Sequence, residues 1–260
     1  MCNDRITMIS QISKILQNSI NSCLGGKTAI AFSGGIDSSV ILTILKNQKN
    51  IGVFCLGTEK SQDLENSRKI AQELKIQITE IVVEEKEVLG AYGKIHEILP
   101  LDLLIIEILI PVYLVAKAAS EAGYKTMLFG SGAEEVFAGY EKYYRARDEG
   151  KDVSKILEEE FQTLPERDIK YVKTICSQFG IEAKFPFYNE ELANLMFFVP
   201  VEKRLDNRLV KKGILREAAK LLNVPKLAIE RKKQAMQYGS GIHKIILKNA
   251  DELNKKYPVK

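Results

Sequence analysis

The chain has 260 residues, of which 45% are hydrophobic and 28% charged, so it can bury a substantial core in one domain. Its 38 basic and 34 acidic side chains leave a formal net charge of +4, too small an excess to indicate a nucleic-acid binder. The four cysteines lie far apart and form no C-x-x-C pair, so the sequence disfavours disulfides and zinc and indicates a reduced, cytoplasmic protein.

Two segments of the chain are rich in apolar residues, one at the N-terminus and one near the middle. Residues 1–24 repeat isoleucine and leucine at helical spacing, which predicts an amphipathic helix. The longest apolar stretch, Leu103 to Ala119, is interrupted by Glu107, Pro111 and Lys117 and falls short of the roughly 20 residues that span a bilayer. We therefore expect no membrane span.

Residues 27–83 alternate between short apolar runs, which are typical of strands, and segments with helical spacing of apolar residues. Strands are expected at 27–32, 51–56 and 76–83, and helices between them at 38–46 and 63–74. This alternation predicts βαβ units with right-handed crossovers, and therefore a parallel sheet covered by helices on both faces. Ligands in such sheets bind at the carboxyl ends of the strands.

Farther along the chain the helical pattern dominates. A long helix is expected at 105–122 and a fourth strand at 125–129, after which strand signals fade from about residue 153. Further helices are then expected at 155–161, 166–179, 190–198, 212–222 and 243–255. The predicted class is α/β, a Rossmann-like parallel sheet followed by a helical C-terminal half. We divide this single domain into an N-terminal helix (1–24), a nucleotide-binding part (25–150) and a helical part (151–260).

The loop after the first strand carries the strongest functional signal, Ser33-Gly34-Gly35-Ile36-Asp37-Ser38. Two adjacent glycines let the backbone approach an anion, and the free amides and dipole of the following helix point at it. The hydroxyls of Ser33 and Ser38 add donors, while the Asp37 carboxylate suits a magnesium ion that accompanies phosphate. The loop predicts a phosphate site, and the alternative is a glycine turn with a serine helix cap.

The string S-G-G-x-D-S after an apolar strand resembles the signature of the PP-loop ATP pyrophosphatases. These enzymes cleave ATP between its α and β phosphates and adenylate a substrate. The loop lacks both the Gly-Lys-Ser/Thr of a Walker A motif and a G-x-G-x-x-G turn. The resemblance implies that ATP and Mg²⁺ bind here, with Asp37 as a metal ligand. It places the nucleotide at Ser33, Gly34, Gly35, Asp37 and Ser38.

Five further motifs resemble asparagine synthetase. Residues 55–63 are similar to its pattern G-x-x-x-S-x-D, which implies an adenine site at Leu56 and Gly57. Residues 128–140 are similar to S-G-E-G-x-D-E-L-F-G-G-Y, which implies nucleotide contacts at Gly130 and Ser131 and a catalytic, metal-binding role for Glu134. Matches continue at 180–187, 214–217 and 231–241. Their collinear order over about residues 25 to 250 identifies the chain as similar to the synthetase domain of asparagine synthetase.

The resemblance also implies two catalytic residues in the C-terminal half. Lys233 matches the family lysine that contacts the ATP phosphates, where an ammonium offsets the charge on departing pyrophosphate. Asp168 matches a family aspartate that would hold Lys233 or the amino group of the substrate. The alternatives are a solvated surface lysine and an exposed helix aspartate.

Several positions depart from the family pattern near the expected chemistry. Ser131 replaces the family glutamate of the ammonia-dependent step, and Glu134 replaces an aspartate. Lys184 and Glu107 stand where the family has arginines. We therefore expect a substrate pocket unlike that of asparagine synthetase, in which aspartate is a poor substrate.

The function expected from these features is an ATP-dependent ligase that forms AMP and pyrophosphate. It would adenylate a small carboxylate and transfer it to a nitrogen nucleophile. About 30 residues precede the phosphate loop, so we expect no glutaminase domain in this chain, and ammonia would be free or come from a separate glutaminase subunit. We expect no membrane or nucleic-acid partner, and a homodimer is left open.

Two alternatives remain. One is a sulfur-transfer or tRNA-modifying enzyme of the same superfamily, which would need a reactive thiol such as Cys55 or Cys176. The other is a nucleotide-binding protein without catalytic activity.

Overall fold

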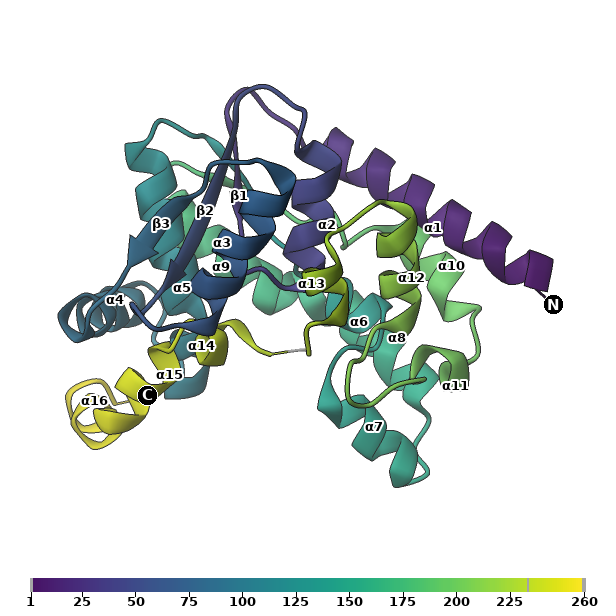
Figure 1. Ribbon diagram of the computed structural model, residues 1–260. Helices are drawn as coiled ribbons and strands as arrows, with labels where there is room; N and C mark the ends of the chain where they lie inside the picture. Colours follow the sequence, from purple (N-terminus) through teal and green to yellow (C-terminus); the bar gives the residue numbers. More distant parts are fainter. Residues whose placement is uncertain (1, 233, 259–260) are drawn as a thin grey trace.

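A computed structural model of the chain describes residues 2–232 and 234–258. Within them, five parallel strands form one sheet in the order β3-β2-β1-β4-β5 (Figure 1). The strands are β1 (Thr28–Ala31), β2 (Ile51–Gly57), β3 (Thr79–Val82), β4 (Thr126–Leu128) and β5 (Glu182–Lys184). The predicted α/β class with a parallel sheet is confirmed.

The sheet is buried on both faces because its strands are apolar on both sides. In β2, Val53 and Cys55 belong to one hydrophobic core, while Phe54 and Leu56 belong to a second core on the opposite face. This follows from the period of two along a strand, and it explains why the strands read as continuous apolar runs.

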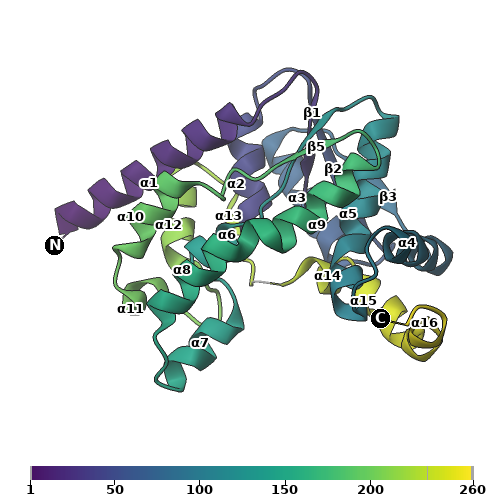
Figure 2. The ribbon, with the colours of Figure 1, turned by 180° about the vertical axis from the view of Figure 1, so that it is seen from behind.

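Helices from both halves of the chain cover the two faces. The first core contains residues of α1 (Cys2–Ser22), α2 (Ile36–Leu45), α3 (Gln62–Leu74), α10 (Glu190–Phe197), α12 (Gly213–Leu221) and α13 (Lys226–Glu230). The second contains residues of α4 (Glu85–Ile98), α5 (Leu103–Glu121), α9 (Asp168–Ser177), α15 (Ile242–Lys248) and α16 (Ala250–Lys256), several of which lie in front in Figure 2.

A smaller third core lies away from the sheet. It is formed around Tyr143, Tyr144 and Leu157. The elements of this region are α7 (Glu141–Asp148), α8 (Val153–Thr163) and α11 (Val201–Arg204). The buried apolar residues of α6 (Ala133–Val136) belong to the first core, and Leu164 of the 3₁₀ turn η1 (Leu164–Glu166) belongs to the second. In Figure 1, α7 projects below the rest of the molecule. The remaining helix, α14 (Met236–Gly239), lies between α13 and α15 in the sequence.

The structure adds elements that the sequence did not predict. β5 pairs with β4 inside the part predicted to be helical, and it escaped prediction because it is three residues long and two of them are charged, Glu182 and Lys184. α4 and α7 were also missed. The predicted helix 243–255 is broken at Asn249 into α15 and α16.

The apolar stretch discussed above is α5. By length and hydropathy it is the one described helix that could cross a membrane, and half of it is buried inside the structure. It packs against α4, α9 and β2, and its buried residues belong to the second core. These contacts are those of a core helix that covers the sheet.

Candidate functional site

The carboxyl ends of β1, β2 and β4 open into a cavity of about 380 Å³. Much of its remaining wall comes from α5, α9 and residues 231–232 and 234–237. Nine residues singled out in the sequence line this cavity: Ser33, Gly35, Asp37, Ser38, Leu56, Gly130, Ser131, Glu134 and Asp168. Segments that are distant in the sequence therefore meet at the edge of the sheet where ligands bind in this class of fold.

The phosphate loop is held by its own hydrogen bonds. The Ser33 amide donates to the Ser38 hydroxyl at 3.3 Å, and that hydroxyl donates to the Gly35 carbonyl at 3.2 Å. Gly34 adopts a φ of +66°, a left-handed conformation that favours glycine. Gly34 does not itself line the cavity, so its role in the structure is to allow the turn.

A buried lysine that the sequence did not indicate joins two residues of the cavity lining. The Nζ of Lys212 donates to both carboxylate oxygens of Asp37 and to Oε1 of Glu134, each at 2.8 Å. Its side chain is 1% exposed. Burial alone would lower the pKa of Lys212, but attraction to the two carboxylates outweighs it, and the pKa is raised. Lys212 is therefore held as an ammonium between two carboxylates.

The backbone at Gly139 lies directly against the side chains of Glu134 and Lys212. A Cβ at Gly139 would collide with the Glu134 carboxylate and the Lys212 side chain, so only glycine fits there. Lys212 precedes α12, which packs against α1 and α2. Its sequence signal is weak, because a lysine pair before an amphipathic helix resembles a solvated surface. The clue was its position two residues before the motif 214–217.

An arginine joins the phosphate loop to the C-terminal segment. Arg231 donates to the Ser33 carbonyl at 2.7 Å and to Oδ1 of Asp63 at 2.5 Å. Arg216 in turn donates to the carbonyls of Ile229 and Arg231, which fixes the chain before that segment. Lys233 follows directly but lies outside the described residues, so its predicted role stays a prediction.

Acidic side chains also line the cavity beside Glu134. Glu135 is 3% exposed, and burial, with repulsion from Glu134 and Asp168, raises its pKa to about 7. Burial and the neighbouring carboxylates also raise the pKa of Tyr140. Asp168 is the exposed first residue of α9. The predicted catalytic residues Glu134 and Asp168 thus line one cavity, and their roles stay predictions.

Besides Gly34, three other residues considered in the sequence lie outside the cavity lining. Gly57 ends β2, where a Cβ would collide with the Ser61 side chain. Glu107 is buried in α5 and pairs with Nδ1 of His243 at 2.9 Å. Lys184 pairs with Glu182 on β5. The expectation that Glu107 and Lys184 change the charge of the pocket was therefore wrong, because both side chains are engaged elsewhere.

The residues at the phosphate loop fit a magnesium ion in their chemistry. Asp37 and Glu134 bring carboxylate oxygens together around the Nζ of Lys212, and each oxygen can accept a further contact. Mg²⁺ typically binds one or two carboxylates together with substrate phosphates and water. Among the described residues no group of three or more His, Cys, Asp or Glu side chains forms a metal site.

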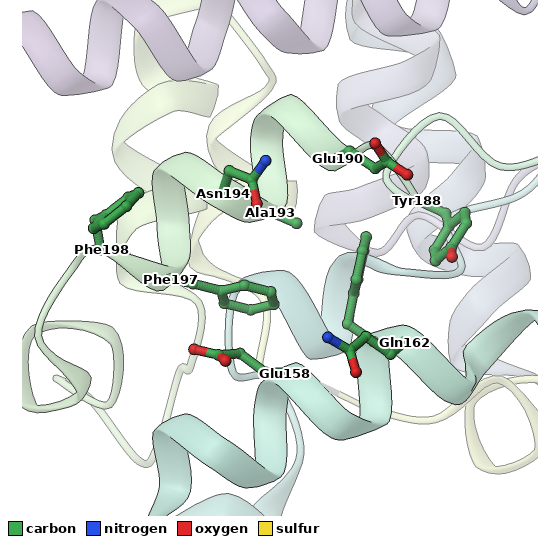
Figure 3. A pocket seen from close by; sticks show the side chains of 9 residues that line it. Glu158, Gln162, Tyr188, Glu190, Ala193, Asn194, Phe197 and Phe198 are labelled. Atoms are coloured by element: carbon green, nitrogen blue, oxygen red, sulfur yellow. The ribbon is translucent and has the colours of Figure 1, made fainter.

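A second, larger hollow of about 490 Å³ lies between α8 and α10 (Figure 3). It is lined by aromatic rings, among them Tyr188 and Phe197, and by the carboxylates of Glu158 and Glu190. None of the residues singled out in the sequence lines it. We therefore assign the chemistry to the cavity at the carboxyl edge of the sheet.

Comparison with known proteins identifies the family. A model described as asparagine synthase matches residues 11–167 and 147–257. The chain belongs to the asparagine synthase family. The resemblance inferred from five short motifs is confirmed.

Individual relatives of this family support the assignment. The putative glutamine-hydrolysing asparagine synthetase 1 of Methanocaldococcus jannaschii is 29% identical over 276 residues, covering 92% of this chain and 51% of that protein. Glutamine-hydrolysing asparagine synthetase B of Escherichia coli is 26% identical over 250 residues, covering 89% and 45%. The chain thus spans about half the length of these curated relatives. A solved structure of NMN synthetase from Francisella tularensis is a more distant likeness, with 13% identity and a TM-score of 0.48 over 98% of this chain and 88% of that one.

Proposed function

We propose that this protein is an ATP-dependent carbon–nitrogen ligase that activates a carboxylate as its adenylate and releases pyrophosphate. The observation that carries the proposal is a pair of cavity-lining carboxylates beside the phosphate loop, Asp37 and Glu134, which the buried Lys212 ammonium holds together. Backbone amides at the start of a helix, together with a magnesium ion held by the two carboxylates, would stabilise charge that develops on a phosphoryl leaving group. Family membership supports ATP as a substrate.

In the first step an oxygen of the substrate carboxylate attacks the α phosphorus of ATP, and the bond from that phosphorus to the bridging oxygen breaks. The backbone of the loop at Gly35 and the hydroxyls of Ser33 and Ser38 would bind the phosphates. Asp37 and Glu134 would hold Mg²⁺, which would neutralise charge on the leaving pyrophosphate. Lys212 would keep both carboxylates in place.

In the second step a nitrogen nucleophile attacks the acyl carbon, loses a proton and displaces AMP. Asp168 lines the cavity near Glu135 and would hold an amino group there. The nitrogen would come from free ammonia or from a separate glutaminase subunit. The curated relatives named above are glutamine-hydrolysing in name, which supports testing both sources.

The test is pyrophosphate exchange. Labelled pyrophosphate should enter ATP only in the presence of a carboxylate substrate and magnesium, and the net products should be AMP and pyrophosphate. The Asp37→Asn variant should lose about 100-fold or more of this exchange while it keeps the native circular-dichroism spectrum, because Asp37 faces the cavity. Release of ADP and phosphate would refute the proposal. Supplying ammonium and glutamine in turn to the complete reaction would identify the source of nitrogen.

The sulfur-transfer alternative finds little support in the cysteines. Cys55 and Cys176 are both buried, neither lines the cavity, and burial raises the pKa of each thiol to about 12. A thiolate is the reactive form, so neither residue is suited to carry sulfur near neutral pH.

A further inference from the structure

The cavity has a second wall that the adenylation chemistry does not use. β2 and β5 lie on opposite sides of the β1–β4 pair. By the family resemblance the adenine base belongs at Leu56, at the end of β2. The side of the cavity toward β5 lies beyond the phosphate loop from that point, and it is available to the acid.

This β5 side is apolar. Its cavity-lining residues are Phe129 at the end of β4, Leu164 in η1, and Tyr171 and Val172 in α9, which packs against β5. Phe129, Leu164 and Val172 are each less than 8% exposed, so they form a fixed surface. Phe129 also stacks on Phe185, with ring centroids 5.9 Å apart.

Helix α5, which packs against both β2 and α9, adds further apolar lining to the cavity. Ile105, Ile108, Leu109 and Val112 all line the cavity. Their spacing of three and four residues places them on one face of the helix, so the whole face presents hydrocarbon. We call the residues of α5, α9, η1 and Phe129 named here the apolar wall.

The charges of the cavity are placed elsewhere. Among the described lining residues, the basic ones are Arg216, Arg231 and Lys232, all from the C-terminal segments. Arg216 and Arg231 are engaged by carbonyls and by Asp63. The one charged residue that α5, η1 and α9 add to the described lining is Asp168, an acid. A second carboxylate on the substrate would therefore meet hydrocarbon and like charge on this side.

We propose that the acid activated by this protein is a monocarboxylate with an aryl or branched-alkyl body, which lies against the apolar wall. This inference rests on the proposed ligase function and specifies its substrate class. It also gives a structural reason for expecting aspartate to be a poor substrate, one that does not depend on Glu107 or Lys184.

Two matched pairs of acids test the substrate class by pyrophosphate exchange. Succinate and 3-phenylpropanoate differ in one carboxylate exchanged for a phenyl ring, and aspartate and phenylalanine differ in the same way. We expect the phenyl member of at least one pair to exceed its partner by 100-fold or more in kcat/KM. Equal or higher values for both succinate and aspartate would overturn the inference but leave the ligase function intact. No exchange with any acid would overturn both.

A variant of the wall tests the location. Tyr171→Asp places a carboxylate on the cavity-facing side of α9, and Lys173→Asp, at an exposed position that does not line the cavity, is the matched control. We expect Tyr171→Asp to lower kcat/KM for the preferred apolar acid at least 30-fold, with the KM for ATP within twofold of the parent, and the control to change neither. A rise in the KM for ATP with an unchanged KM for the acid would place the nucleotide on this wall and overturn the inference.

Discussion

The two walls of the cavity are built in opposite ways. At the phosphate loop, Lys212 meets carboxylates 175 and 78 residues away in sequence, and the cluster tolerates no Cβ at Gly139. The apolar wall comes mainly from the regular faces of α5 and α9. Loss of one member of a buried charge cluster lowers the stability of the folded protein, whereas apolar surfaces accept substitutions of similar volume. The charged cluster at the phosphate loop therefore fixes the reaction, while the apolar wall can change the choice of substrate without disturbing that cluster.

The largest effect should come from Lys212→Met. This change removes the cation and leaves two carboxylates in each other's field, so the free energy of unfolding should fall by about 3–5 kcal/mol, as measured by urea denaturation. The triple variant Lys212→Met, Asp37→Asn, Glu134→Gln removes the charges together, and it should regain most of the stability without regaining pyrophosphate exchange. A loss below about 1 kcal/mol for the single variant would contradict the assigned role.

The next effect concerns the predicted role of Lys233. Lys233→Ala should raise the activation free energy by about 3 kcal/mol, which lowers the turnover number more than 100-fold. The effect on ATP binding should be smaller, because the charge that Lys233 offsets grows in the transition state. Steady-state exchange kinetics measure both quantities. The control is Lys226→Ala, whose side chain is 82% exposed. An unchanged turnover number for the Lys233 variant would refute the role.

A moderate effect is expected at Arg231, which joins the phosphate loop to the C-terminal segment. Arg231→Lys keeps the charge but cannot reach both the Ser33 carbonyl and Asp63, because a lysine lacks the planar fork. The KM for ATP should rise about 10-fold, or about 1.4 kcal/mol. Arg68→Lys, which changes an exposed arginine paired with Glu80, should leave that KM unchanged. Equal effects of the two substitutions would show that Arg231 does not position the loop.

The smallest effect should be found at the buried thiols. With pKa values of about 12, Cys55 and Cys176 are almost fully protonated at pH 8, so maleimide should not modify them in the folded protein. Their reactivity would increase only as the pH approaches 12. Mass spectrometry of the treated protein measures this, and urea-unfolded protein provides the positive control. Rapid modification at either position in the folded protein would restore the sulfur-transfer alternative.

The sequence determined the class of the fold and the phosphate loop. Apolar runs alternating with amphipathic segments require a parallel sheet with helices on both faces, and S-G-G-x-D-S sits in one short stretch, so neither depends on distant residues. Five collinear motifs were sufficient for the family. The same local signals failed for β5, because three residues with two charges carry no strand pattern.

Only the tertiary structure decided which charges share the site. Lys212 reads as a surface lysine in the sequence, and it joins two residues of the cavity lining because α12 packs on α1 and α2 and brings its first turn to Asp37. From the sequence, Glu107 and Lys184 were expected to change the charge of the substrate pocket. In the folded protein Glu107 pairs with His243 and Lys184 pairs with Glu182 instead. Helical periodicity identifies the apolar residues of α5 and α9, but it cannot tell which of them face a cavity and which face the core. That choice depends on how the helices cross the sheet, because contacts between residues far apart in the chain leave no local pattern.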